Sequence, residues 1–143
     1  MKFFIKIFFL FSIIILQFAC SKNNSKLKLS NSEAFAFDVG DGWEVNGTVV
    51  ATGFQQKKNK NIYKSKLYCF VNLITSSNDT LKKIFSDTLE NKQKNKFIDI
   101  PVEVQIELDR TFETGSYKLL FNIRDEYSKQ KKIAEAKFNL TKE

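Results

Sequence analysis

The chain contains no histidine, and this absence excludes more chemistry than any other feature of its composition. Histidine is the usual general base, the usual partner of a nucleophilic serine or cysteine, and the commonest metal ligand. Catalysis by Ser-His-Asp or Cys-His arrangements is therefore excluded. Any activity would have to rest on carboxylates or lysines, and no two acidic residues are spaced in a way that indicates such a site.

Cysteine, glycine and proline are also scarce, with two, five and one residues respectively. There is no CxxC pair and no glycine-rich phosphate loop, so the sequence predicts no cofactor. Cys69 lies in an alternating apolar stretch, where a buried thiol is unreactive. Asp38, Asp41 and Glu44 lie beside two glycines, which leaves calcium open as an alternative, but a Gly/Asp turn between strands explains them without a metal. We predict no catalytic, cofactor or metal-binding residues.

The N-terminus has the pattern of an export signal. Lys2 and Lys6 precede an apolar run over residues 7–16, and the small Ala19 follows. This order of charged, apolar and small residues is typical of a signal peptide. The apolar run is well short of the roughly 20 residues that a membrane-spanning helix needs. We therefore predict a signal peptide over residues 1–19.

Residues 16–20, Leu-Gln-Phe-Ala-Cys, resemble the lipobox of bacterial lipoproteins, in which a small residue precedes the cysteine that receives the lipid. Ala19 and Cys20 match this pattern, whereas Gln17 and Phe18 depart from its commonest form. The resemblance implies lipidation of Cys20 and attachment to a membrane of the bacterial cell envelope. Several acyl chains on one cysteine hold a protein firmly at a bilayer. An ordinary signal peptide beside an unmodified cysteine is the alternative.

The excess of basic residues gives a formal net charge of +7, and lysines cluster at residues 57–60, 92–96 and 129–132. Each cluster falls in a stretch that reads as a turn, so solvated loops explain it. No nucleic-acid recognition motif is present, and we predict no nucleic-acid partner. Attraction to anionic lipid or to an acidic polymer stays open.

Downstream of a polar segment, the dominant hydrophobic period is two, which is typical of half-buried strands. Residues 20–32 read as a flexible tether and residues 33–143 as one domain. The clearest strand is 97–109, where Ile98, Ile100, Val102, Val104, Ile106 and Leu108 share one face. Pro101 on the other face cannot donate a ladder hydrogen bond, so this strand should lie at a sheet edge or carry a bulge.

Further strands are predicted at residues 35–39, 43–54, 67–74, 117–123 and 134–140. In the third of these, Tyr68, Phe70 and Ile74 lie opposite the main apolar set, which predicts burial on both faces. Residues 79–90 are ambiguous, because their apolar spacing of three and four also fits a helix; the surrounding strands favour a strand there. Six or seven strands predict an all-β, antiparallel sandwich.

Residues 113–119 resemble the tyrosine corner of immunoglobulin-like sandwiches. An acid, a small residue and a tyrosine recur there as Glu113, Gly115 and Tyr117, although antibody domains have a cysteine where Leu119 stands. The resemblance implies an immunoglobulin-like β-sandwich of about seven strands, with the Tyr117 hydroxyl bonded to upstream backbone. It implies nothing about activity.

Aromatic residues are the remaining candidates for binding. Trp43 is in phase with Val45, which favours a core position, whereas Tyr127 falls in a predicted loop near Arg124. We name Tyr127 and Arg124 as candidate partner-binding residues. The sequence then favours a non-enzymatic interaction module, lipid-anchored in the envelope, that contacts an envelope or surface protein. The alternative is a carrier of a small hydrophobic ligand with a β-barrel-like domain.

Overall fold

The computed structural model describes residues 26–142, and these form eight β-strands without a helix. Predicted features before residue 26, including the signal peptide, Cys20 and most of the tether, lie outside the described residues. The strands are β1 (Lys28–Asp38), β2 (Gly42–Thr52), β3 (Lys57–Asn59), β4 (Ile62–Ile74), β5 (Thr80–Gln93), β6 (Asp99–Asp109), β7 (Gly115–Asp125) and β8 (Lys131–Leu140). The prediction of an all-β fold is confirmed, with seven long strands and the short β3.

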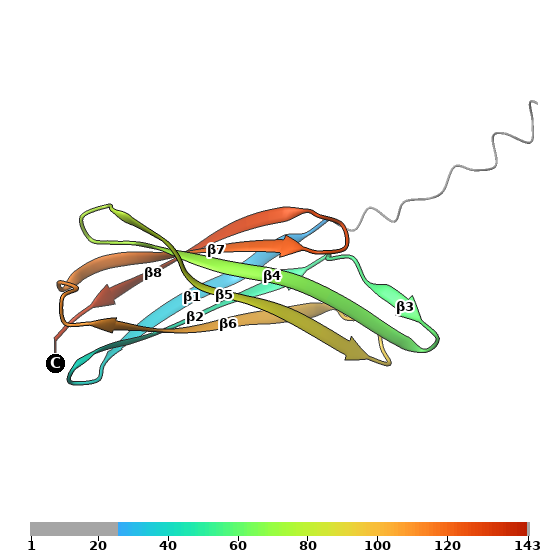
Figure 1. Cartoon of the computed structure of the whole chain (residues 1–143), viewed down its shortest axis with the longest axis horizontal. Helices are drawn as coiled ribbons and strands as arrows, with labels where there is room; N and C mark the ends of the chain where they lie inside the picture. Colours follow the sequence, from blue (N-terminus) through green and yellow to red (C-terminus); the bar gives the residue numbers. More distant parts are fainter. Residues whose placement is uncertain (1–25, 143) are drawn as a thin grey trace, which may run out of the picture.

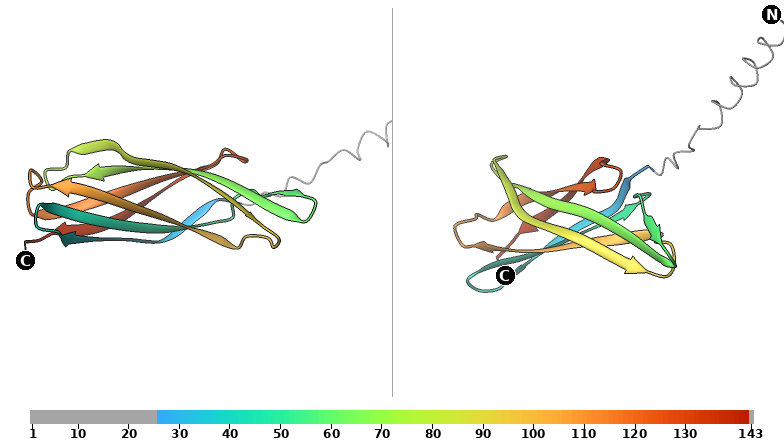
Figure 2. Two further views of the ribbon diagram at one scale, coloured as in Figure 1. Left: turned by 60° about the horizontal axis from the view of Figure 1, so that its bottom comes forward. Right: turned by 45° about the vertical axis from the view of Figure 1, so that its right-hand side comes forward.

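The strands form two antiparallel sheets packed as a sandwich (Figures 1 and 2). One sheet has the order β1-β2-β6. The other has the order β3-β4-β7-β8, with β5 paired to β4. In immunoglobulin-like sandwiches the first, second and fifth strands share a sheet, and the third, sixth and seventh share the other. The long strands follow this arrangement, with the fourth, β5, joined to the second sheet.

The core lies between the sheets and is built by strict alternation. Strand β2 contributes Trp43, Val45, Val49 and Ala51, and its other side chains are partly exposed. Facing them are the buried residues of β4 and β7, namely Leu67, Cys69, Val71, Leu73, Tyr117, Leu119, Phe121 and Ile123. The core position of Trp43 is confirmed. The space between the sheets is filled by large side chains, an arrangement that offers the ligand-carrier alternative no support.

Strand β6 is an edge strand, as Pro101 predicts, because it pairs with β2 alone. Ile100, Val102, Val104, Ile106 and Leu108 all face the core. The prediction was wrong for Ile98, which is 85% exposed. The strand begins only at Asp99, so Ile98 belongs to the preceding turn and alternation no longer fixes its direction.

Residues 80–93 form the strand β5, which confirms the favoured interpretation over a helix. Its misleading spacing has a cause in the register. Phe85 pairs with Val71 and Leu81 pairs with Leu73. Between these two pairs β5 advances by four residues while β4 advances by two, which is a β-bulge in β5. Lys83 lies in this bulge at a φ of 55°, and its backbone N–H donates to Asn72 Oδ1 at 2.8 Å. A bulge breaks the period of two and imitates helical spacing.

The domain starts earlier than predicted. Strand β1 begins at Lys28, and Leu27 is fully buried, with its N–H donating to Gln130 Oε1 at 3.0 Å. The assignment of residues 27–32 to a flexible tether was therefore wrong. Within β1, Ala34 and Ala36 face inward, whereas Phe35 and Phe37 are each 57% exposed. The inward residues of β1 are therefore small and the outward ones large, which is the reverse of the usual pattern in a half-buried strand.

The tyrosine corner is present. Tyr117 is buried at the start of β7, and its hydroxyl donates to the backbone oxygen of Glu113 at 2.7 Å. Its ring stacks on Phe138 of β8, with ring centroids 5.7 Å apart. The resemblance read from the sequence therefore corresponds to the expected hydrogen bond.

The sandwich is elongated, and its two ends differ in their turns (Figure 1). Lys26, the first described residue, lies at the end formed by the turns at residues 53–61, 94–98 and 126–130, which we call the Lys26 end. The turns at residues 39–41, 75–79 and 110–114 form the opposite end. Both sheets and the buried core between them are built from residues 26–142. No helix capable of crossing a bilayer occurs among these residues.

Candidate functional site

A shallow groove crosses the outer face of the sheet that contains β4, β7 and β8. Its volume is about 290 Å³, and its lining residues are Tyr68, Phe70, Asn122, Ile123, Arg124, Lys131, Lys132 and Ile133. Two registers bring them together. Tyr68 pairs with Arg124 and Arg124 with Lys131, while Phe70 pairs with Asn122 and Asn122 with Ile133. The three strands thus place an aromatic floor beside a basic rim.

Arg124, predicted from the sequence as a candidate contact, lies at this rim. Its guanidinium carbon is 5.1 Å from the centre of the Tyr68 ring, within the range of a cation–π contact. Its Nε is 2.5 Å from Glu126 Oε1, and its side chain is 41% exposed. The neighbouring Arg124 and Lys129 lower the pKa of Glu126, with Lys129 the larger influence. Arg124 is therefore held in place while its outer edge meets solvent.

The floor of the groove differs from the sequence prediction. Tyr68 and Phe70 were expected to be buried by a second layer, but both are half-buried on an outer face that the described chain leaves uncovered. Their rings lie 6.1 Å apart, and Ile133 beside them is 67% exposed. The sequence reasoning missed the groove because it read apolar outward residues as evidence of a covering layer.

Tyr127 does not share the groove with Arg124. It lies in the β7–β8 turn, half-buried, with Lys57 Nζ 4.3 Å from its ring centre. Its backbone N–H donates to Asp125 Oδ1 at 2.9 Å. Tyr127 is more exposed than the buried Trp43, to which the sequence analysis preferred it, and its role in binding a partner stays a prediction.

Asp125 is a structural residue that the sequence reasoning missed. Its side chain is fully buried, and its Oδ2 accepts hydrogen bonds from the Gln55 backbone N–H at 2.7 Å and from Ser128 Oγ at 2.5 Å. These bonds join the turn after β2 to the β7–β8 turn. The sequence did offer a signal for this role: Asp125 ends a predicted strand, and turn residues follow two and three positions later.

Of the three acidic residues around Gly40, Asp38 is paired with a cation of the chain itself. Both terminal guanidinium nitrogens of Arg110 donate to Asp38, and the guanidinium carbon lies 4.6 Å from the centre of the Trp43 ring. The Gly40 N–H donates to Asp38 Oδ1 at 2.9 Å. Within residues 26–142, no three acidic or cysteine side chains gather in a way that could hold a metal ion.

Cys69 is buried in β4 between the sheets. Burial, together with the nearby Asp87, raises the pKa of its thiol to about 12. The thiol therefore stays protonated at neutral pH, which agrees with the interpretation of Cys69 as a core residue.

Comparison with known proteins gives little to place beside this geometry. No known protein-family model matches the chain, and no curated protein matches it. Among solved structures, it is similar to part of a family 123 glycoside hydrolase from Clostridium perfringens, a protein studied for glycolipid glycan hydrolysis, with a TM-score of 0.48 and 11% identity. The match covers 76% of this chain but only 22% of the hydrolase.

Proposed function

We propose that this chain is a lipoprotein of the bacterial cell envelope, anchored through Cys20, whose β-sandwich domain binds a partner protein without catalysing a reaction. The observation that carries the binding role is the groove over β4, β7 and β8. Its volume of about 290 Å³ and its half-buried aromatic floor suit the side chains of a docked segment. The anchoring rests on the signal peptide and lipobox-like pattern.

The groove favours binding over chemistry because of what lines it. Its two lysines, Lys131 and Lys132, have no carboxylate, serine, threonine or cysteine beside them in the lining. Tyr68, Phe70 and Ile133 offer apolar contact, while Arg124 and Lys131 offer positive charge. Aromatic residues and arginine are the side chains that most often dominate binding energy at protein interfaces. The partner would present an apolar side chain next to a carboxylate.

Site-specific photo-crosslinking tests this proposal. A benzophenone side chain replaces Ile133 in the groove and, as the control, the exposed Glu103 on the opposite sheet. In living cells we expect a discrete adduct from position 133 and none of that size from position 103. The adduct should weaken at least fivefold when Tyr68→Ala and Arg124→Ala are added. The same adducts from both positions, or no adduct from position 133, would contradict the binding role of the groove.

A further inference from the structure

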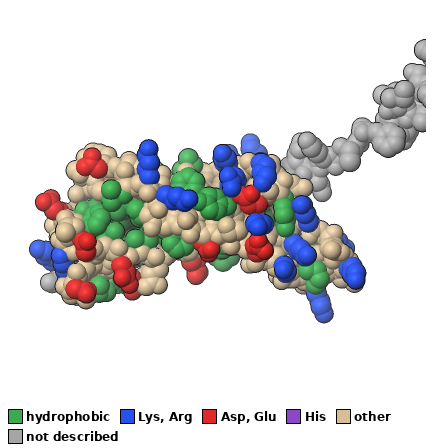
Figure 3. Space-filling model, viewed as in Figure 1, with side chains coloured by type: hydrophobic (Ala, Val, Ile, Leu, Met, Phe, Trp, Pro, Cys, Tyr) green, Lys and Arg blue, Asp and Glu red, His purple; other side chains and the backbone are tan. Residues whose placement is uncertain are grey.

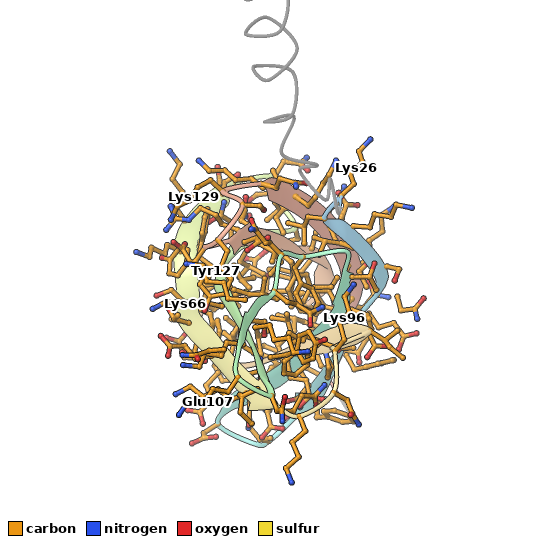
Figure 4. All side chains as sticks on the ribbon, turned by 90° about the vertical axis from the view of Figure 1, so that its right-hand side faces the viewer. Lys26, Lys66, Lys96, Glu107, Tyr127 and Lys129 are labelled. Carbon is orange, nitrogen blue, oxygen red and sulfur yellow. The ribbon has the colours of Figure 1, made fainter. Side chains whose placement is uncertain are left out.

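Positive charge is concentrated at the Lys26 end of the domain. Apart from Lys131 and Lys132, which line the groove, the exposed lysines there are Lys26, Lys28, Lys57, Lys58, Lys60, Lys92, Lys94, Lys96 and Lys129. Figure 4 looks onto this end, and its labelled Lys26, Lys66, Lys96 and Lys129 lie around it. On the face seen in Figure 3, blue side chains crowd the same end, at the right of the view. The three lysine clusters of the sequence, far apart along the chain, thus meet on one surface.

Few acidic side chains offset these lysines. Asp125 is buried beneath the turns, and Glu126 is paired with Arg124 and Lys129. Glu90 is paired with Lys66, and Asp99, next to Ile98, is an exposed carboxylate at this end. The turns of the opposite end carry Asp41, Asp79 and Glu113, with Arg110 already engaged by Asp38. Charge is therefore distributed unevenly between the two ends of the domain, and the electrostatic potential at the Lys26 end is positive.

An apolar side chain is exposed in one of the turns of this end. Ile98 is 85% exposed in the β5–β6 turn, two residues after Lys96. The turn is fixed from below, because the Phe97 N–H donates to Gln56 Oε1 and Gln56 Nε2 donates to the Phe97 oxygen, each at 2.8 Å. The Phe97 ring also packs near Phe54, with centroids 6.4 Å apart. Ile98 is thus presented outward by a braced turn.

We propose that the Lys26 end docks on an anionic lipid surface, with the lysines at the headgroups and Ile98 inserted between them. Lysines near an anionic bilayer and exposed apolar side chains that enter its interface both favour membrane binding. The placement rests on the proposed anchor at Cys20. Five residues separate Cys20 from Lys26, and even a fully extended chain between these two residues spans only about 20 Å. An anchor at Cys20 would therefore keep this end, and not the opposite one, beside the bilayer.

Vesicle binding by a fragment of residues 21–143 tests the docking without the anchor. We expect the fragment to sediment with vesicles that contain phosphatidylglycerol but not with pure phosphatidylcholine, and to dissociate as salt is raised. A triple variant, Lys94→Glu, Lys96→Glu and Lys129→Glu, should lose at least tenfold in affinity. The matched control, Lys82→Glu, Lys137→Glu and Lys142→Glu, makes the same charge change away from this end and should stay within about twofold. Ile98→Ser should weaken binding severalfold with no change in net charge.

Two outcomes would overturn the proposal. The first is an absence of binding to the anionic vesicles at low salt, with circular dichroism showing a folded fragment. The second is an equal loss of affinity in the two triple variants, which would mean that net charge alone drives binding. Because the fragment lacks Cys20 and leaves the groove intact, either failure is separate from a failure of the anchor or of partner binding.

Discussion

At the scale of single residues, Asp125 is a buried carboxylate with no arginine or lysine among its described hydrogen-bond donors. Its oxygens accept from Gln55, Tyr127 and Ser128 and so hold two turns of the Lys26 end together. Hydrogen bonds to a charged group are worth more than neutral ones, and a mismatched buried partner is costly.

Asp125→Asn tests this dependence. One carboxylate oxygen becomes an amide nitrogen, which cannot accept a hydrogen bond, so at least one of the donors Gln55, Tyr127 and Ser128 loses its acceptor. We expect the free energy of unfolding to fall by about 1–3 kcal/mol. Urea denaturation followed by tryptophan fluorescence measures the change, and the exposed Asp99→Asn is the control. Equal stability of the Asp125 variant and wild type would show that the buried carboxylate does not hold the turns.

Cys69 gives a second test at this scale. Because burial raises the pKa of its thiol to about 12 from an ordinary value of 9.0, the folded protein holds this proton more tightly than the unfolded chain. The unfolded state therefore loses the proton first, and stability from this group should fall as pH rises between these values. In a Cys20→Ser chain, where Cys69 is the single thiol, a disulfide reagent at pH 8 should react only after urea is added. Rapid reaction of the native protein would contradict the buried position.

At the scale of elements, the alternation of apolar residues was enough to predict most strands. It located β2, β4, β6, β7 and β8, since one buried face imposes a period of two. The edge position of β6 was predicted from Pro101, which cannot donate a ladder hydrogen bond. The alternation misplaced Ile98 because a strand end is not marked by periodicity. It left β5 ambiguous because the bulge at Lys83 is a matter of pairing with β4. It placed the start of the domain too late because Leu27 and Leu29 stand among polar residues.

The groove could be predicted only in part, because its lining residues come from different strands. Arg124 was identified from its position near a turn, but its neighbours Tyr68 and Ile133 come from other strands, and only the registers of β4 with β7 and of β7 with β8 join them. A single sequence does not give these registers. It also does not show that the outer face of β4 is left uncovered by the described chain.

The tyrosine corner provides a prediction for one element. In Tyr117→Phe, the ring keeps its packing against Phe112 and Phe138, but the bond to the Glu113 oxygen is lost. We expect a loss of about 0.5–1.5 kcal/mol in the free energy of unfolding. Tyr63→Phe, a change in a half-buried tyrosine of β4, should have a smaller effect in the same urea titration. A Tyr117→Phe variant as stable as the wild type would show that the corner hydrogen bond does not stabilise the fold.

At the scale of the whole molecule, three regions have separate proposed roles. The N-terminal segment would supply the anchor, the lysine-rich end would face the bilayer, and the groove would stay accessible on the side of the sandwich. The sequence analysis interpreted the lysine clusters as solvated turns, and the fold brings these turns to the same end of the domain (Figure 4). Their position at the end where Lys26 lies is what connects the domain to the proposed anchor.

Anchoring through Cys20 is the central claim, and intact mass spectrometry tests it most directly. Protein purified from detergent-solubilised membranes is compared with a Cys20→Ser variant from the same cells. We expect the wild-type chain to begin at Cys20 and to carry the added mass of acyl chains, which the variant lacks. A wild-type chain that begins at another residue, or begins at Cys20 with no added mass, would contradict the account.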